Sequence, residues 1–550
     1  MAITVLRSVG RQRVAWYRTM PSEAESAPFV ERQFLAKQEY CDDAKLQDLN
    51  YLGGLAAVVF NQRQEKPFQI GNALGMHAQR LLNYDCHVII RPAANRFPIL
   101  QRVLGGLELP TAGLHLAKSG APPLPHLRVF SLDVPWTDIA NFVLTYPPGP
   151  APAPVQNLTI LPTSVESNLS GSRLILLRRA FSDCAEVHLI PMKGGRSAGV
   201  VVYRAHAQLR GGVEGEWPQP FFVKIGPRRK VFDEYMNYEW RVDPYIPFHL
   251  GPRLVRDRCC LGAYEGVIVG DYVDGSECLT DCACQGRATA AISCLFDKTL
   301  AGWHRRAQNE NSRPISALLA RLFPPTMPLA RFARAQELGA TQNLPRLRRS
   351  FDRCTSTPVL VGPIHGDLHA KNVRVRATDA IVIDFFSHRN SPLLADAASL
   401  EASLLVDGFE KDEREPTEWI ASIEKLYQNS PAKQATPHGT PKDASFWFYS
   451  CVAQIRRYAR QWECQDHQYA AALAAALLRK ATKDAYAREP KASRHAAAYV
   501  FAERILMAAF GKASASPPVQ NAAPAPPAGA QELPGGNPAA PAAVVPQGIE

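Results

Sequence analysis

The sequence predicts an α+β protein in which a small α/β domain precedes a larger region of two lobes. Before residue 145, apolar runs suited to buried strands alternate with amphipathic helical patterns, which favours a small parallel sheet. Short strand patterns bounded by glycine dominate residues 166–275, whereas residues 276–511 show mainly helical periodicity. A strand-rich lobe followed by a helical lobe accounts for this change of pattern.

The composition excludes several classes of protein. The chain has 550 residues, of which 46% are hydrophobic and 21% charged, as in ordinary globular proteins. It contains no run of ~18 apolar residues, so we expect no membrane span. Twelve scattered cysteines indicate reduced thiols and a cytoplasmic location. The net charge of +11 is spread over short basic stretches, which indicates phosphate-bearing ligands rather than nucleic acid.

Two proline-rich segments divide the chain. The first, beginning YPPGPAPAP, predicts a stiff linker over residues 146–165. The second has almost no large apolar side chains, so residues 512–550 are predicted to be a disordered tail. The folded regions are therefore an accessory α/β domain at 1–145, a strand-rich lobe at 166–275 and a helical lobe at 276–511.

The accessory domain has strand and helix patterns in alternation. Its predicted strands are 2–6, 54–60, 86–92 and 127–133, and its predicted helices are 29–40, 72–84 and 97–107. The layout resembles a receiver or flavodoxin-like domain. A receiver needs acidic residues after its strands, but Asn61 and Gln62 follow the second predicted strand. We therefore expect a degenerate sensing or docking module that binds a protein partner, and no catalysis.

The residues suited to chemistry gather in the segment 358–405. His365-x-Asp367 is followed by Asn372, and Asp384 ends the apolar strand AIVID. Two carboxylates and an amide on loops beside short strands suit Mg²⁺, which prefers oxygen ligands and leaves positions to water and phosphate. Phosphoryl transfer needs such a metal together with an Asp that orients the acceptor hydroxyl.

The run HGDLHAKN with a downstream IDF resembles the catalytic loop and metal-binding Asp of the aminoglycoside phosphotransferase and choline kinase family. That family has a bilobal fold like that of protein kinases. The resemblance implies that Asp367 and Asn372 are catalytic, with Asp367 as the base. Asn372 and Asp384 would bind Mg²⁺. It implies structural roles for His365 and Asp396.

The resemblance extends to earlier residues in the order that a kinase needs. Lys224, at the end of FFVK, would contact the α- and β-phosphates. Glu239 on the next helix would pair with this lysine, with Glu234 as the competing candidate. Backbone groups near Asp271 and Tyr272 would bind adenine. A glycine loop would approach the phosphates with Gly194, Gly195, Ser197 and Gly199.

These features predict a bacterial phosphotransferase that uses Mg²⁺ with ATP or GTP and acts on an unknown hydroxyl acceptor. The layout LLRRAF…GGRSAG…FVKIG…E is also similar to the kinase-like ternary complex-associated domains of bacterial conflict systems, which implies a role in signalling or defence. Two alternatives stay open. One is a pseudokinase-like module that binds nucleotide without transfer. The other is a basic nucleic-acid scaffold, whose binding would depend steeply on salt.

The helical lobe is expected to supply the acceptor pocket. In the resembled family, helices after the metal loop form much of that pocket, and here the pattern 444–462 is one of them. Arg456, Arg457 and Arg460 on this helix argue against a cationic acceptor such as an aminoglycoside. An antibiotic-resistance role is therefore not predicted.

Overall fold

The computed structural model describes most of the chain between residues 11 and 511. The described ranges are 11–61, 67–92, 127–162, 169, 171–192, 199–211, 220–411, 414–428, 444–483 and 491–511. The predicted strand 2–6, the predicted helix 97–107 and the tail 512–550 lie outside them. None of the helices in these ranges is both long and apolar enough to cross a membrane.

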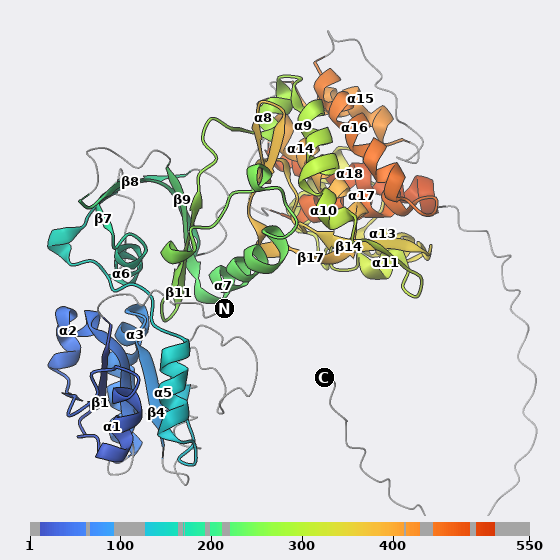
Figure 1. The fold of residues 1–550 in the computed structure, drawn as a ribbon. Coiled ribbons are helices and arrows are strands. Elements are labelled where there is room, and N and C mark those ends of the chain that lie inside the picture. Colours follow the sequence, from blue (N-terminus) through green and yellow to red (C-terminus); the bar gives the residue numbers. More distant parts are fainter. Residues whose placement is uncertain are drawn as a thin grey trace, which may run out of the picture. The chain divides into compact units, whose positions relative to one another are not determined.

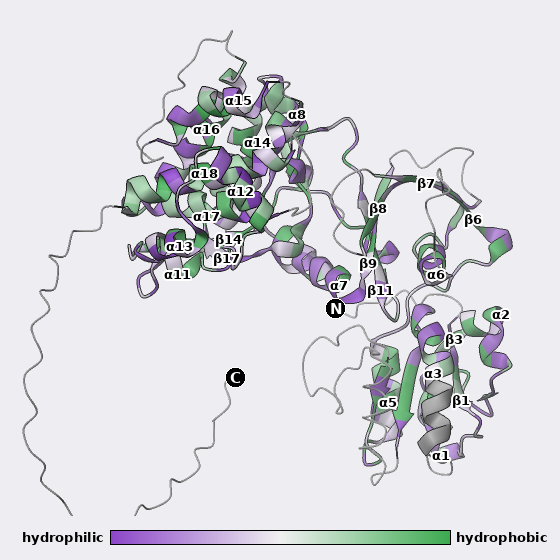
Figure 2. Cartoon of the chain, turned by 180° about the vertical axis from the view of Figure 1, so that it is seen from behind, coloured by the Kyte–Doolittle hydropathy of each residue, from purple (hydrophilic) through white to green (hydrophobic). Residues whose placement is uncertain are grey.

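The first region is built on a five-stranded sheet in which all neighbouring strands are parallel, in the order β2-β1-β3-β4-β5 (Figure 1). The strands are β1 Arg13–Tyr17, β2 Tyr40–Cys41, β3 Leu55–Asn61, β4 His87–Arg91 and β5 Leu127–Val129. The helices are α1 Glu23–Val30, α2 Leu49–Gly53, α3 Pro67–Asn83 and α5 Trp136–Thr145. Every residue of β3 and β4 is buried, and Figure 2 shows hydrophobic residues on these central strands. Such burial is expected when helices cover both faces of a parallel sheet.

Three predicted strands of this region, 54–60, 86–92 and 127–133, correspond to β3, β4 and β5. The predicted helix 72–84 falls within α3. The predicted helix 29–40 is wrong, because α1 ends at Val30 and β2 begins at Tyr40. Gln33 and Gln38 have φ of 65° and 59°, which a helix does not allow. The apolar spacing that imitates a helix arises because Phe29, Phe34 and Ala36 pack into one cluster.

The strand-rich lobe contains a six-stranded sheet in the order β10-β11-β9-β8-β7-β6. Its strands are β6 Thr159–Pro162, β7 Cys184–Pro191, β8 Val201–Leu209, β9 Phe221–Pro227, β10 Cys260–Leu261 and β11 Glu265–Asp271. All neighbours are antiparallel except β6 and β7. β6 lies within the segment predicted as a linker. Two helices belong to this lobe, α6 Gly171–Ala180 and α7 Arg228–Asn237, and α7 continues into a π-helical turn, η4 Tyr238–Val242.

The helical lobe packs around the largest core cluster, to which α14, α16, α17 and α18 contribute. Its helices are α8 Leu279–Cys284, α9 Ala288–Cys294, α10 Ala301–His304, α11 Ile315–Leu318, α12 Leu329–Glu337, α13 Leu344–Asp352, α14 Leu394–Asp407, α15 Pro416–Ile423, α16 Phe446–Trp462, α17 Gln468–Thr482 and α18 Lys491–Phe510. Two small antiparallel sheets complete it. Their strands are β12 Glu277–Cys278, β15 Val373–Arg376 and β16 Asp379–Val382 in one, and β13 Gln308–Glu310, β14 Val359–Ile364 and β17 Arg389–Pro392 in the other.

Candidate active site

One buried carboxylate, that of Asp396, holds the loop that follows β14 through two backbone hydrogen bonds. The Asp396 side chain, 1% exposed, accepts the backbone N–H of His365 at 2.7 Å and that of Gly366 at 3.0 Å. The fully buried His365 ring places Nε2 2.9 Å from the Ile383 carbonyl oxygen, so this nitrogen donates. His365 and Asp396 thus hold the loop in place through these hydrogen bonds.

Gly366 is the position in this loop where only glycine fits. Its φ is +80°, and a Cβ there would collide with the Ser387 carbonyl oxygen. The close approach places the loop against the segment that follows Asp384. Asp367 is therefore set at a fixed position relative to that segment.

The β15–β16 hairpin brings the two predicted metal ligands together. Asn372 and Asp384 flank its paired residues Val373 and Val382. The Ile383 N–H donates to the Asn372 carbonyl at 3.0 Å, and the Asn372 side-chain amide donates to the Asp367 carbonyl at 3.2 Å. Asp384 has φ of +67°, a left-handed conformation that is strained for a non-glycine residue and is common at functional sites.

Lys224 links the two lobes. Its ammonium lies 2.6 Å from Glu234 on α7 and 2.9 Å from the Asp384 carboxylate of the helical lobe. Burial lowers the pKa of Lys224, but the carboxylates Glu234 and Asp384 outweigh burial and leave that pKa above its usual value. The lysine therefore stays charged between two carboxylates, one from each lobe.

The predicted pairing of Lys224 with Glu239 is not found, and the competing candidate Glu234 takes its place. Figure 2 shows α7 as mainly hydrophilic, yet Glu234 is only 2% exposed because it faces Lys224. Glu239 lies beyond the end of α7 in η4 and pairs with Arg256 at 2.7 Å. Five residues of helix turn a side chain by about 140° from its starting direction, so the two acids cannot share one partner.

The backbone N–H groups predicted to bind adenine already donate hydrogen bonds within the protein. The N–H of Asp271 donates to the Arg253 carbonyl at 2.9 Å, and the N–H of Tyr272 donates to the Pro220 carbonyl at 3.1 Å. Neither donor is therefore free for a base. Gly199 lies in a left-handed turn with φ of +79°. Of the remaining glycine-loop residues, Gly194, Gly195 and Ser197 lie outside the described ranges.

Asp367 has cations on its open side. Arg479 lies 3.5 Å and Lys483 3.7 Å from one carboxylate oxygen, and His369 lies 3.9 Å from the other. Burial raises the pKa of Asp367, but Lys483, His369 and Arg479 together hold it below its usual value. Burial and then Lys480 lower the pKa of His369 to about 4, so His369 is neutral near pH 7. The positive charge beside Asp367 therefore comes from Arg479 and Lys483.

Sequence reasoning missed these two cations and placed the charge on Arg456, Arg457 and Arg460. Arg456 is 1% exposed and forms a buried ion pair with Glu401 at 2.6 Å, so it belongs to the core. A signal was present in the sequence. Arg479 and Lys483 are two of the basic residues that end the alanine-rich run 468–483; Arg479 lies in the last turn of α17, and Lys483 is the extended residue that caps it.

The residues present fit a divalent cation whose coordination is completed by phosphate. Within the described ranges, no group of three or more His, Cys, Asp or Glu side chains could hold a metal by itself. Asn372 uses its amide nitrogen on the loop carbonyl and so keeps its oxygen for a ligand, while the Asp384 side chain is 47% exposed. Mg²⁺ is commonly held by one or two protein oxygens together with nucleotide phosphates.

Comparison with known proteins identifies part of the chain. Residues 215–432 match the family model described as the phosphotransferase enzyme family, which confirms the resemblance seen in the HGDLHAKN segment. Residues 215–432 are thus similar to the kinase-like phosphotransferases of this family. No curated protein matches. The region before it is an α/β domain with a parallel five-stranded sheet.

Several solved structures are similar at low identity. An aminoglycoside phosphotransferase from Streptomyces rimosus has 18% identity and a TM-score of 0.28, over 52% of this chain and 97% of its own. A putative fructosamine-3-kinase from Thermobifida fusca has 16% identity and a TM-score of 0.31, over 59% and 98%. A glucosamine kinase, solved with glucosamine, ADP and inorganic phosphate, has 12% identity and a TM-score of 0.29, over 56% and 81%.

Proposed function

We propose that this protein is a Mg²⁺-dependent phosphotransferase that moves the γ-phosphate of ATP to a hydroxyl group. The observation that carries the proposal is the meeting of Lys224 and Glu234 with Asp384, next to the loop that presents Asp367. A structural ion pair alone would not need Asp384 to be half exposed and strained beside a second, cleft-facing carboxylate.

Each side chain has a distinct task in this reaction. Lys224, oriented by Glu234, would hold the α- and β-phosphates. Asp367 would orient the acceptor hydroxyl and take its proton as the acceptor oxygen bonds to the γ-phosphorus. The bond between that phosphorus and the β,γ-bridging oxygen breaks, and ADP leaves. Mg²⁺ held by Asn372 and Asp384 would neutralise the charge on the β- and γ-phosphates.

The acceptor, in this proposal, carries a negative charge of its own. Two cations, Arg479 and Lys483, face the single carboxylate of Asp367, so this side of the cleft has a positive excess. Such an excess attracts a carboxylate or phosphate group on the acceptor and repels an aminoglycoside. The ammonium of Lys483 is carried by a flexible side chain and suits charge attraction, whereas the planar guanidinium of Arg479 suits directed hydrogen bonds.

The accessory domain would supply a partner-binding module in a cytoplasmic signalling or defence protein. Its strand order, β2-β1-β3-β4-β5, is the order of flavodoxin-like doubly wound sheets, which supports a receiver or flavodoxin-like fold. Such sheets present their carboxyl ends as a binding edge. This edge is where we expect a protein partner to be sensed.

The alternative is a pseudokinase-like module that binds nucleotide without transferring phosphate. One observation favours it: both carboxylates that catalysis needs are already held by cations, Asp384 by Lys224 and Asp367 by Arg479 and Lys483. A site that must break these pairs for each turnover would be slow.

Nucleotide binding by the full-length chain, measured by calorimetry with ATP and with GTP, separates the two. We expect Mg²⁺-dependent binding of ATP that Asp384→Asn weakens at least tenfold, followed by transfer of labelled phosphate to an acceptor. Binding without a need for Mg²⁺, unchanged in Asp384→Asn, would support the pseudokinase. A folded wild-type preparation that binds no nucleotide would refute both.

A further inference from the structure

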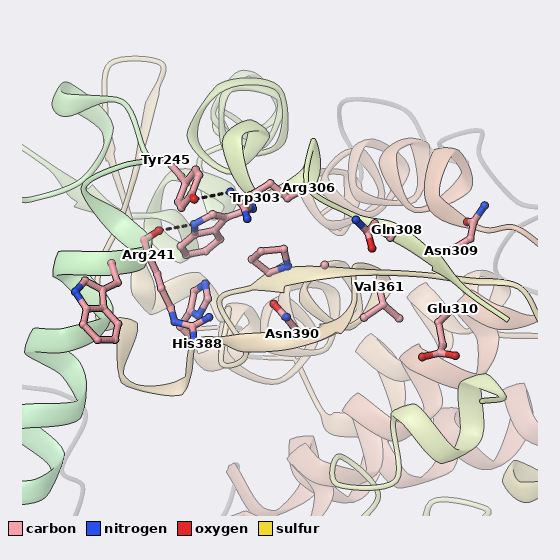
Figure 3. Close-up of a pocket in the computed structure, with 13 residues that line it drawn as sticks. Arg241, Tyr245, Trp303, Arg306, Gln308, Asn309, Glu310, Val361, His388 and Asn390 are labelled. Carbon is pink, nitrogen blue, oxygen red and sulfur yellow. Dashed lines mark hydrogen bonds between the residues drawn. The ribbon is translucent and has the colours of Figure 1, made fainter. Parts of the chain in front are cut away.

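A cavity of about 550 Å³ lies where the turn after α7 meets α10, β14 and β17 (Figure 3). Its volume is within the range of small-ligand sites. Its lining includes none of Lys224, Asp367 or Asp384. The cavity is therefore a feature that phosphoryl transfer does not explain.

The wall of this cavity contains a buried histidine whose polar atoms are unsatisfied. His388 is 9% exposed, and neither ring nitrogen has a hydrogen-bond partner among the residues that the structure describes. Buried polar side chains are nearly always paired, so each exception needs an explanation. Because His388 lines the cavity, a ligand with a polar group would supply the missing partner.

The cavity also carries excess positive charge. Figure 3 shows the Arg241 side chain reaching toward the His388 ring, and Arg241 has no ion-pair partner within the described ranges. Arg306 adds a second guanidinium, which stacks 4.8 Å from the centre of the Tyr245 ring and donates to its hydroxyl. The one carboxylate in the lining, Glu310, is already engaged by Arg313 at 2.9 Å. An anionic group therefore suits the space beside Arg241 and His388.

Aromatic surface completes the chemistry. The Trp303 ring meets His388 edge-on with centroids 4.6 Å apart, and its indole N–H is already used on the Arg241 carbonyl at 2.6 Å. Trp240, also in the lining, is 63% exposed. Trp303 itself is only 1% exposed, so Trp240 supplies the aromatic surface that a flat apolar group can contact.

We infer that this cavity is a regulatory site for a small organic anion with a flat ring, whose acidic group binds Arg241 and His388 and whose ring packs against Trp240. The inference goes beyond the proposed phosphotransfer and would hold for a pseudokinase as well.

The cavity is connected to the nucleotide side of the cleft. Arg241 lies in η4, which directly continues the helix that bears Glu234. Trp303 packs edge-on against Phe385, the residue after Asp384, at 5.9 Å between centroids, and Asn237 donates to the Phe385 carbonyl at 2.9 Å. A ligand that joins Arg241 to His388 would fix the end of α7 against this segment. It would thereby favour the arrangement in which Lys224 meets both carboxylates.

The probe is phenylphosphonate, which combines a ring with an anion that cannot be transferred. Inorganic phosphate tests the anionic group alone, and benzyl alcohol tests the ring alone. Calorimetry on the full chain should show binding of phenylphosphonate and much weaker binding of inorganic phosphate or benzyl alcohol. Arg241→Ala should weaken it at least tenfold. Arg305→Ala, a neighbouring exposed arginine outside the lining, should leave it within twofold. Arg479→Gln should also leave it unchanged, which excludes binding beside Asp367.

His388→Phe gives an independent test, because it should weaken phenylphosphonate binding without lowering the melting temperature. Replacing an unsatisfied buried ring by an apolar ring of similar shape should leave the melting temperature equal to or above that of wild type. The same change should weaken phenylphosphonate binding at least tenfold. A fall in melting temperature together with unchanged binding would show that His388 is an ordinary core residue and would overturn the inference.

Coupling to the active site is measured by reciprocity. With phenylphosphonate bound, the affinity for the ATP analogue AMP-PNP should rise about fivefold, and AMP-PNP should raise phenylphosphonate affinity by the same factor. Wild-type protein that does not bind phenylphosphonate, or Arg241→Ala that binds it as tightly as wild type, would refute the site. Binding without any change in nucleotide affinity would refute its regulatory role.

Discussion

The two sides of the cleft have opposite charge balances. On the side that we propose binds nucleotide, one cation, Lys224, stands between two carboxylates, Glu234 and Asp384. On the side that we propose binds the acceptor, one carboxylate, Asp367, faces two cations, Arg479 and Lys483. The negative excess on the first side calls for a metal ion to accompany the nucleotide. The positive excess on the second side calls for an acceptor that brings negative charge.

The largest expected effect comes from removing the carboxylate at the centre of the acceptor side. Asp367→Asn keeps the size of the side chain and the loop braced by Asp396, but it loses the group that takes the acceptor proton. General-base catalysis is worth about 10²–10⁴-fold, so phosphate transfer should fall by about 10³-fold. Mg²⁺-ATP affinity, measured by calorimetry, should change little. A variant with near wild-type turnover would remove Asp367 from the mechanism.

The next effect tests the positive excess. Arg479→Gln combined with Lys483→Gln removes both cations. KM for an anionic acceptor should rise about 10–100-fold, because the two cations share one anionic group and a charge-assisted contact to it is worth about 1.5–3 kcal/mol. Turnover of a neutral alcohol should be much less affected. Steady-state kinetics with glycerol and glycerol phosphate as the matched pair would show the difference.

Arg460→Gln is the matched control for this experiment. Arg460 is exposed on α16 and is one of the three arginines from which the sequence argued against a cationic acceptor. We expect its KM for both alcohols to equal that of wild type. Equal effects of Arg460→Gln and of the double variant would mean that charge acts at long range and not through contacts beside Asp367.

The sequence predicted the parts of the site whose residues are close together along the chain, and it missed those that depend on contacts between distant segments. Asp367, Asn372 and Asp384 belong to one loop and hairpin, so their spacing alone indicated their proximity. The choice between Glu234 and Glu239 depends on which face of α7 meets β9, and that is fixed by tertiary packing.

Tertiary packing also explains why the sequence assigned the positive charge near the acceptor to Arg456, Arg457 and Arg460 rather than to Arg479 and Lys483. Arg456 points inward because Glu401 on α14 and the hydroxyl of Tyr469 on α17 form a buried polar group with it. No periodicity within α16 reveals those partners. The predicted helix 29–40 is wrong for a similar reason: Phe29 at the end of α1 packs into one cluster with Phe34 and Ala36, which lie beyond the helix.

A smaller effect distinguishes the two acids of the nucleotide side. Glu234→Gln keeps a hydrogen bond to Lys224 but removes a charge, so nucleotide affinity should fall about tenfold. Glu239 pairs with Arg256 and not with Lys224, so Glu239→Gln should leave nucleotide affinity within twofold. Calorimetry on both variants compares them directly, and the reverse order of effects would restore the pairing that the sequence predicted.

The smallest expected effect is a shift in the pH dependence of kcat/KM, caused by a change in the charge around Asp367. Burial raises the pKa of Asp367, and the cations, led by Lys483, hold it below its usual value, so the carboxylate stays ionised as the pH falls. Lys483→Gln removes the largest of these lowering effects and should raise that pKa. The acidic limb of the pH profile of kcat/KM, measured with a neutral alcohol, should therefore move to higher pH. Glu239→Gln, far from this carboxylate, should not move it. An acidic limb that stays in place in Lys483→Gln would mean that a group other than Asp367 takes the proton.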